Sequence, residues 1–196
     1  MNTLRAFIAV DLPPDIRSQL DALTDRLRRL PGQESMRFVA ASGIHLTLRF
    51  LGEISPALAA SLHAVLDDAA RRVPGFSIHV RGAGCFPSGR QPRVLWVGLE
   101  DPGGMLTTLQ RAVEGGCAVL KLPAEDRPFS PHLTLARVRR EAGAGAGTFV
   151  RTVLESERGL DLGEMPVDAI HLFRSELRPS GAVYSCLYSA ALGGGA

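Results

Sequence analysis

The feature that most constrains this chain is a four-residue segment that occurs twice. His45-Leu46-Thr47-Leu48 is repeated letter for letter as His132-Leu133-Thr134-Leu135, 87 residues later in a chain of 196. Ordinary residue usage gives such a match among five histidines with a probability of roughly 0.003. A repeat at a little under half the chain length predicts two similar lobes within one domain that spans residues 1–196.

Each copy of the segment has the alternation of a β-strand. Residues i and i+2 of a strand point to the same face, so His and Thr share one face and the two Leu share the other. The Leu pairs can anchor each strand to a hydrophobic core, joined by Phe50 in the first copy. A titratable ring and a hydroxyl that are presented twice on the remaining face indicate a functional surface.

Hydrophobic periodicity places further elements around the two segments. Apolar alternation predicts strands at 3–11, 36–39, 44–51, 76–86, 94–99, 132–138, 167–174 and 183–192. Stripes of 3.6-residue period predict a helix that begins at Pro13-Pro14 and ends at Pro31-Gly32, and others at 56–72, about 104–120 and 148–157. Short hairpin-like groups without a regular βαβ rhythm indicate an α+β fold with antiparallel sheets.

Composition excludes several classes of protein. Apolar residues make up 45% and charged residues 21%, and the mean hydropathy is +0.09, which excludes a disordered chain and a multi-span membrane protein. The apolar run from Ala6 to Val10 is too short for a signal peptide or a membrane span, so we expect a cytoplasmic protein. The net charge of +2 does not predict a polyanion-binding surface. Lys121 is the only lysine among the 22 basic residues, and the others are arginines. This preference for Arg fits phosphate recognition or, more simply, a G+C-rich genome.

The sequence shows no sign of a metal site, a disulfide framework or a nucleotide loop. Cys85, Cys117 and Cys186 are widely spaced without a CxxC motif, so we expect them to be reduced and structural. No carboxylate or Cys lies at ligand spacing from either His segment, which argues against a metal. The Gly-rich segment 143–148 lacks the Gly-Lys-Ser/Thr ending of a P-loop, and we expect a flexible loop there.

If the two lobes pack with approximate two-fold symmetry, two imidazoles and two hydroxyls converge across a cleft. Such a set suits hydrolysis of a phosphodiester without a metal. One neutral imidazole can remove a proton from water, and one imidazolium can protonate the departing alkoxide. The Thr hydroxyls can donate hydrogen bonds to the non-bridging phosphate oxygens as negative charge develops.

With these motifs the chain resembles the two-histidine phosphoesterases, which are defined by two His-x-Thr-x motifs. It is most similar to their bacterial and archaeal branch, the RNA 2′,3′-cyclic phosphodiesterases that were once described as 2′-5′ RNA ligases. The resemblance extends in order over nearly the whole chain. The segments that carry it are the opening strand Arg5-Ala6-Phe7-Ile8-Ala9-Val10, the first motif within 45–52, the strand at 92–96 and the second motif within 127–137.

The resemblance implies a bilobal fold with a pseudo-two-fold cleft and cleavage of a terminal 2′,3′-cyclic phosphate to a 2′-phosphate. By matching position, His45 would be the general acid and His132 the general base. Thr47 and Thr134 would bind phosphate, and Arg137 would contact the substrate. The substrates would be RNA ends or nucleotides with a 2′,3′-cyclic phosphate, with no cofactor and no metal, and we expect a monomer.

Several side chains near the motifs have two interpretations. Arg137 lies five residues after His132, so strict alternation puts it on the Leu face unless the strand bends after Ala136. Arg49 lies four residues after His45, so alternation puts it on the cleft face, but it could lie beyond the cleft. For Phe50 and Trp96, stacking on a terminal base is possible and packing in the core is the simpler expectation. Among the other histidines, His63 and His79 fit surface positions and His171 fits a buried or half-buried one.

Two alternative functions use the same residues. Joining of RNA ends through a 2′-5′ bond is the reverse reaction, with a 5′-hydroxyl in place of water. A non-catalytic module that binds RNA ends or nucleotides would keep the pocket without turnover, although intact His and Thr in both motifs argue against it.

Overall fold

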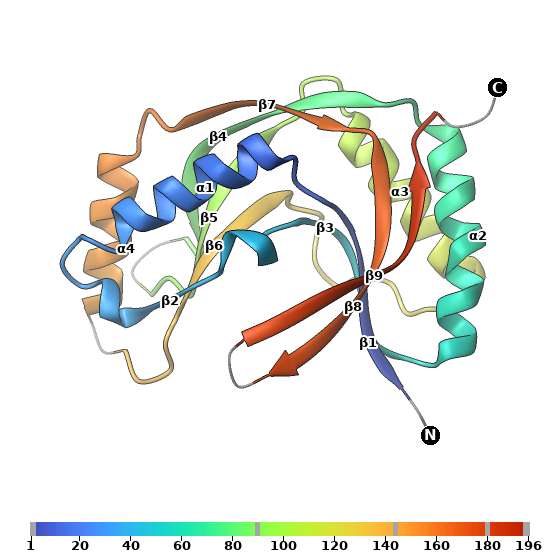
Figure 1. The fold of residues 1–196 in the computed structure, drawn as a ribbon, viewed down its shortest axis with the longest axis horizontal. Coiled ribbons are helices and arrows are strands. Elements are labelled where there is room, and N and C mark those ends of the chain that lie inside the picture. Colours follow the sequence, from blue (N-terminus) through green and yellow to red (C-terminus); the bar gives the residue numbers. More distant parts are fainter. Residues whose placement is uncertain (1–2, 89–90, 143–144, 179–180, 194–196) are drawn as a thin grey trace.

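The computed structural model describes residues 3–88, 91–142, 145–178 and 181–193. The chain forms two antiparallel sheets (Figure 1). Sheet A has the strand order β3-β1-β8-β9, with β1 (Leu4–Val10), β3 (Leu46–Ile54), β8 (Ala169–Arg178) and β9 (Gly181–Ala191). Sheet B has the order β2-β6-β5-β4-β7, with β2 (Met36–Phe38), β4 (Phe76–Phe86), β5 (Val94–Glu100), β6 (His132–Val138) and β7 (Asp161–Val167). The predicted α+β class with antiparallel sheets is confirmed.

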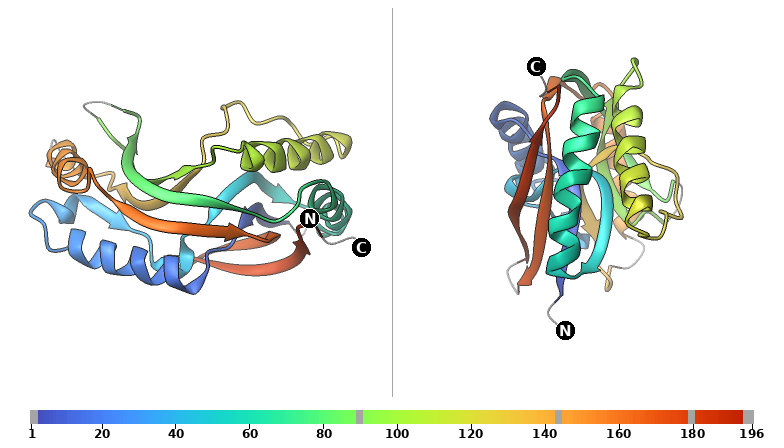
Figure 2. Two further views of the ribbon diagram at one scale, coloured as in Figure 1. Left: turned by 90° about the horizontal axis from the view of Figure 1, so that it is seen from above. Right: turned by 90° about the vertical axis from the view of Figure 1, so that its right-hand side faces the viewer.

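Four helices flank the sheets in two pairs, which lie at opposite ends of the molecule (Figure 2). Helix α2 (Pro56–Arg72) packs against β8 and β9, and α3 (Met105–Val119) packs against α2 and β3. Helix α1 (Pro14–Leu27) contacts β7, and α4 (Gly145–Ser156) contacts β4. We call sheet A with α2 and α3 lobe A, and sheet B with α1 and α4 lobe B. No helix in the described residues is long and apolar enough to cross a membrane.

The helices form where local sequence favours them. Pro14 and Pro56 stand at the first helical position, where a missing N–H costs nothing. Ser55 caps α2 by accepting a hydrogen bond from the backbone N–H of Leu58 at 3.2 Å. Each apolar stripe is buried in one continuous core that joins the two lobes. In α1 the buried apolar residues are Ile16, Leu20, Leu23 and Leu27.

Strand register shows that the duplication extends well beyond the four-residue motifs. Thr47 of β3 lies opposite Ala9 of β1, and Thr134 of β6 lies opposite Trp96 of β5. Ala9 and Trp96 are 87 residues apart, as are the two threonines. On the other side, Ala9 lies opposite His171 of β8 and Trp96 lies opposite Gly84 of β4, again 87 residues apart. The strands β3-β1-β8 therefore match β6-β5-β4 residue by residue.

The pseudo-two-fold axis passes through the ladder between β4 and β7. Ile78 lies opposite Met165, and these two residues are themselves 87 apart. Around this pair the ladder maps onto itself, as the interface of a two-fold dimer does. The halves of the chain also exchange strands, since β4 from the first half joins sheet B and β8 from the second half joins sheet A. Each lobe therefore contains segments from both halves.

Two expectations about individual elements are wrong. The sequence does not predict strand β7, because Gly163 and Pro166 interrupt its apolar pattern and the expected strand begins only at 167. Helix α4 begins at Gly145 and not at Thr148, so residues 145–147 of the expected loop are helical. Residues 143 and 144 lie outside the described residues.

Candidate active site

The two motif histidines are held in the same way. His45 immediately precedes β3, and its Nδ1 lies 3.0 Å from the carbonyl oxygen of Gly43. His132 opens β6, and its Nδ1 lies 2.7 Å from the carbonyl oxygen of Ser130. A carbonyl only accepts, so Nδ1 donates in both rings, and in the neutral imidazole the lone pair is then on Nε2. Both histidines therefore present Nε2 for proton transfer.

The burial pattern of the two motifs follows the expected alternation. The four motif leucines are buried, with exposed fractions of 0% to 3%. His45, Thr47, His132 and Thr134 are half-buried. Within the part of the chain that the structure describes, neither threonine hydroxyl has a hydrogen-bond partner. The hydroxyls are thus available to a ligand.

A β-bulge interrupts both strands at the same place after the motif threonine. At Leu48 two residues of β3 oppose one residue of β1, and at Leu135 two residues of β6 oppose one of β5. An extra residue reverses the alternation, so the two residues at each bulge both face the core. Leu48 and Arg49 are buried in the first copy, and Leu135 and Ala136 in the second.

The bulge places Arg137 on the exposed face of β6, with Thr134. Of the two interpretations of Arg137 that the sequence allows, this is the one in which the strand departs from strict alternation. In lobe A the equivalent position is Phe50, which is 55% exposed and whose ring centroid lies 6.3 Å from that of Phe7. Core packing is therefore wrong for Phe50. It is also wrong for Trp96, which is half-buried and lies opposite Thr134 on the same face.

Arg49 does not lie on the face of His45 and Thr47, contrary to the alternation of the sequence. It is 4% exposed and lies between β3 and α3. Its Nη1 donates to the carboxylate of Glu114 at 3.0 Å, and the carboxylate of Glu125 lies 3.8 Å away. Its Nη2 donates to the carbonyl of Pro123. Since a buried guanidinium needs such partners, Arg49 is a structural residue that ties β3 to α3.

The positive charge of Arg137 acts on both motif histidines, and His132 acts on His45. The pKa of His45 is lowered to about 4, chiefly by burial and to a smaller extent by the charges of Arg137 and His132, against the effects of the Gly43 hydrogen bond and Asp11. Burial also lowers the pKa of His132, with Arg137 again contributing. Cα atoms of β3 and β6 come within 8 Å of each other. Both shifts favour the neutral form of the two rings in the free protein.

Aromatic rings surround each histidine. His45 stacks on Phe7 with ring centroids 4.4 Å apart and meets the edge of Tyr184 at 5.1 Å. His132 meets Phe86 edge-on at 5.0 Å and lies 6.3 Å from Trp96. These apolar walls desolvate the imidazoles, which is the main cause of their lowered pKa values.

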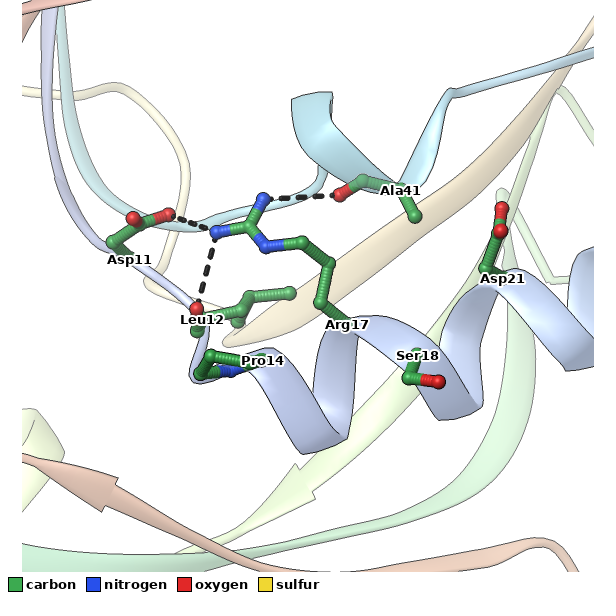
Figure 3. A pocket seen from close by; sticks show the side chains of 7 residues that line it. All are labelled: Asp11, Leu12, Pro14, Arg17, Ser18, Asp21 and Ala41. Carbon is green, nitrogen blue, oxygen red and sulfur yellow. Dashed lines mark hydrogen bonds and ion pairs between the residues drawn. The ribbon is translucent and has the colours of Figure 1, made fainter.

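An arginine from α1 braces the segment that holds His45. Arg17 donates to the carbonyl of Ala41 at 3.3 Å, to the carbonyl of Leu12 at 3.0 Å and to the carboxylate of Asp11 at 2.8 Å (Figure 3). Ala41 opens the 3-10 turn that ends at Gly43, the hydrogen-bond partner of His45. A hollow of about 620 Å³ lies beside this brace (Figure 3), but neither motif histidine lines it.

Comparison with known proteins gives the same duplication. A model of the family described as LigT-like phosphoesterases matches twice, at residues 10–96 and 97–184. The chain belongs to the LigT-like phosphoesterase family. It is 32% identical to the RNA 2′,3′-cyclic phosphodiesterase of Methanothermobacter thermautotrophicus, over 93% of this chain and 95% of the relative. It is 36% identical to the protein of the same name from Thermus thermophilus, over 97% and 91% of the two chains.

Solved structures of similar sequence have the same fold. A protein from Thermus thermophilus superposes with a TM-score of 0.79 at 32% identity and covers 97% of this chain and 99% of its own. Escherichia coli LigT in complex with 3′-AMP gives a TM-score of 0.75 at 29% identity, with the same coverage.

The remaining histidines of this phosphoesterase have structural surroundings. His63 is half-buried and stacks on Tyr188 at 4.0 Å, so the expected solvated position is wrong. His79 contacts the carboxylate of Asp161 at 2.7 Å on the face away from the core. His171 is half-buried, as expected, and burial lowers its pKa.

The cysteines differ in burial. Cys117 is buried, Cys85 is half-buried and Cys186 is exposed, and all three are free thiols. A structural role in the core therefore fails for Cys186. Among the described residues no three His, Cys, Asp or Glu side chains are grouped so that they could hold a metal ion.

Proposed function

We propose that this phosphoesterase hydrolyses terminal 2′,3′-cyclic phosphates of RNA to 2′-phosphates. The observation that carries the proposal is the pair of imidazoles at the starts of two strands that approach each other, with identical Nδ1 anchors and with Nε2 atoms that have no hydrogen-bond partner among the described residues. The names of the relatives, RNA 2′,3′-cyclic phosphodiesterases from bacteria and archaea, support the substrate class.

In the proposed reaction, His132 Nε2 takes a proton from water as the water oxygen bonds to phosphorus. The bond from phosphorus to the 3′ oxygen breaks, and His45 Nε2–H gives its proton to that oxygen. The product carries a 2′-phosphate and a free 3′-hydroxyl. Each turnover leaves the two rings with exchanged protonation, which a proton transfer through solvent restores.

Three further side chains stabilise the phosphate in this proposal. The hydroxyls of Thr47 and Thr134 donate hydrogen bonds to the two non-bridging oxygens, one from each lobe. Arg137 supplies a full positive charge as negative charge develops on phosphorus-bound oxygens. Because all three groups are in place before the substrate binds, little reorganisation accompanies the reaction.

The substrate itself sets the protonation of the pair. In the free protein burial and Arg137 hold the pKa values of both histidines low. A bound phosphate anion offsets the charge of Arg137 and attracts a proton to one imidazole, so the pKa values rise in the complex. We therefore expect kcat to have its optimum at a higher pH than kcat/KM. Both pH profiles should be bell-shaped, and the two apparent pKa values of each profile describe the histidine pair and not either histidine alone.

The test is a chromatographic assay of EDTA-treated protein with a short RNA that ends in a 2′,3′-cyclic phosphate. Accumulation of the 2′-phosphate alone supports both the reaction and its regiochemistry, and shows that no added metal is required. A folded protein that binds this RNA without turnover contradicts the proposal and favours the non-catalytic module. A donor with a 5′-hydroxyl in the same assay measures ligation against hydrolysis.

The proposal includes a monomer that acts in the cytoplasm. Each group in the mechanism comes from one chain, so a second copy is not needed to complete the site. Sedimentation equilibrium tests the monomer, and fractionation of cells tests the location.

A further inference from the structure

Two arginines lie directly opposite each other at the edge of sheet B. Arg37 of β2 pairs with Arg137 of β6 in the antiparallel ladder. Directly paired residues point to the same face, with Cβ atoms about 4.5–5.5 Å apart. Both arginines are exposed, while Met36 and Ala136 beside them are buried. Arg37 therefore shares the face of the motif residues.

This arrangement costs free energy unless an anion compensates it. Like charges in directly opposed positions of a ladder destabilise a sheet. Among the described residues neither Arg37 nor Arg137 forms an ion pair, whereas nine other arginines do. A third guanidinium is near, since Arg139 Nε donates to the backbone carbonyl of Met36 at 3.2 Å. The edge thus has positive charge without a partner in the described chain.

Arg37 also reaches toward the other lobe. Its Nη2 is close to the start of β9, where a Cβ added to Gly181 would lie 3.9 Å from it. Arg37 is therefore positioned beside both β6 and the first residue of β9. Lobe A has no counterpart, because Phe50 stands at the position equivalent to Arg137 and β3 is the edge strand of sheet A.

We propose that Arg37 binds the phosphodiester that precedes the terminal nucleotide of an RNA substrate. The inference rests on the proposed function, in which Arg137 takes the reacting phosphate. A cyclic phosphate carries one negative charge, and a second guanidinium beside Arg137 matches a second phosphate of the same strand. Arg37 is thus a positioning residue that makes oligonucleotides better substrates than cyclic mononucleotides.

The experiment compares kcat/KM for a short RNA that ends in a 2′,3′-cyclic phosphate with that for 2′,3′-cyclic AMP. For Arg37→Gln we expect a loss of about tenfold on RNA, mainly in KM, and a change below about twofold on the mononucleotide. Arg111→Gln is the matched control, since Arg111 is an exposed arginine of α3 without an ion pair in the described residues. Equal losses on both substrates, or none on either, overturn the proposal.

A binding measurement separates this proposal from the catalytic one. Fluorescence anisotropy with a labelled RNA that ends in a 2′-phosphate gives Kd at several KCl concentrations. Removal of one phosphate contact lowers the slope of log Kd against log salt by about 0.7. Arg37→Gln with an unchanged slope overturns the assignment of Arg37. A wild-type protein that binds this RNA with the expected slope but hydrolyses neither substrate contradicts the proposed function instead.

Discussion

The surroundings of His45 and of His132 share their backbone arrangement and some side chains, and they differ in other side chains. In both lobes a carbonyl two residues earlier anchors Nδ1, a threonine follows two residues later, and a bulge comes next. A phenylalanine also flanks each ring, Phe173 near His45 and Phe86 near His132. The duplicated parts are those that fix the positions of the imidazoles and hydroxyls.

The differences lie around this shared frame. The residue opposite the motif threonine is Ala9 in lobe A and Trp96 in lobe B, and the next strand compensates with His171 and Gly84. Beyond the bulge lobe A exposes an aromatic ring and lobe B exposes a guanidinium. Two nearly symmetric imidazoles thus meet an asymmetric environment, as the proposed division into one acid and one base requires.

Replacement of the two histidines tests this division of roles and gives the largest expected effects. His45→Gln and His132→Gln should each lower kcat by about 10³-fold, because each removes one proton transfer. Neither should change the midpoint of thermal unfolding by more than a few degrees, since both rings are only half-buried. Steady-state hydrolysis of RNA with a 2′,3′-cyclic phosphate measures the effect.

A substrate with sulfur at the 3′ bridging position separates acid from base. A thiolate leaves without protonation, so this substrate should restore most of the activity of His45→Gln and little of that of His132→Gln. If the substrate restores the activity of His132→Gln and not that of His45→Gln, His132 is the acid and His45 the base, and both histidines remain catalytic.

The equivalent positions Arg49 and Ala136 predict a difference in stability. Arg49→Met removes a buried guanidinium and leaves the carboxylate of Glu114 without its partner, which should lower the free energy of unfolding by about 3 kcal/mol. Ala136 shows that a neutral residue fits the same backbone in lobe B. Urea denaturation measures the loss, and Arg49→Met with Glu114→Gln should recover part of it. Activity of the folded variant that falls more than about tenfold contradicts the structural role.

Arg49 also shows where prediction from the sequence ends. The motif residues, their strand faces and the buried leucines follow from alternation, and the duplication predicts two similar lobes. Alternation fails after Leu48 and Leu135, because a bulge depends on the register of two strands and not on either one alone. Alternation in the sequence therefore does not decide on which strand face Arg137 lies, and it predicts the wrong face for Arg49.

Pairing across the molecule explains the other errors. Strand β7 has a weak apolar pattern, and it forms because β4 offers the partner related by the pseudo-two-fold axis. The 87-residue spacing of Ile78 and Met165 is visible in the sequence, but neither residue belongs to a motif that would draw attention to it. Such symmetry is recognised only when the register of the ladder is known.

The equivalent positions Arg137 and Phe50 predict a difference in catalysis. Arg137→Met should lower kcat/KM by about 10²-fold, because a charge on the developing phosphate anion is lost. Its positive charge also lowers the pKa values of both histidines, so its removal should move both limbs of the pH profile to higher pH. Phe50→Met should change kcat/KM by less than about threefold and leave the profile in place. An unshifted profile in Arg137→Met argues against its contact with the pair.

The smallest effect concerns the neighbours Trp96 and Gly84 of lobe B, a large and a small residue where lobe A has Ala9 and His171. A Cβ at Gly84 would lie 2.2 Å from the ring of Trp96, so Gly84→Ala should lower the free energy of unfolding by about 2 kcal/mol. In a Trp96→Ala background the same change should cost less than about 0.5 kcal/mol, since the clash is gone. Gly115→Ala, in an open position of α3, is the control and should stabilise by roughly 0.5 kcal/mol. An equal cost of Gly84→Ala in both backgrounds would mean that the backbone conformation at this position requires glycine. His171 stands at the equivalent position of lobe A, so the backbone there accepts a side chain.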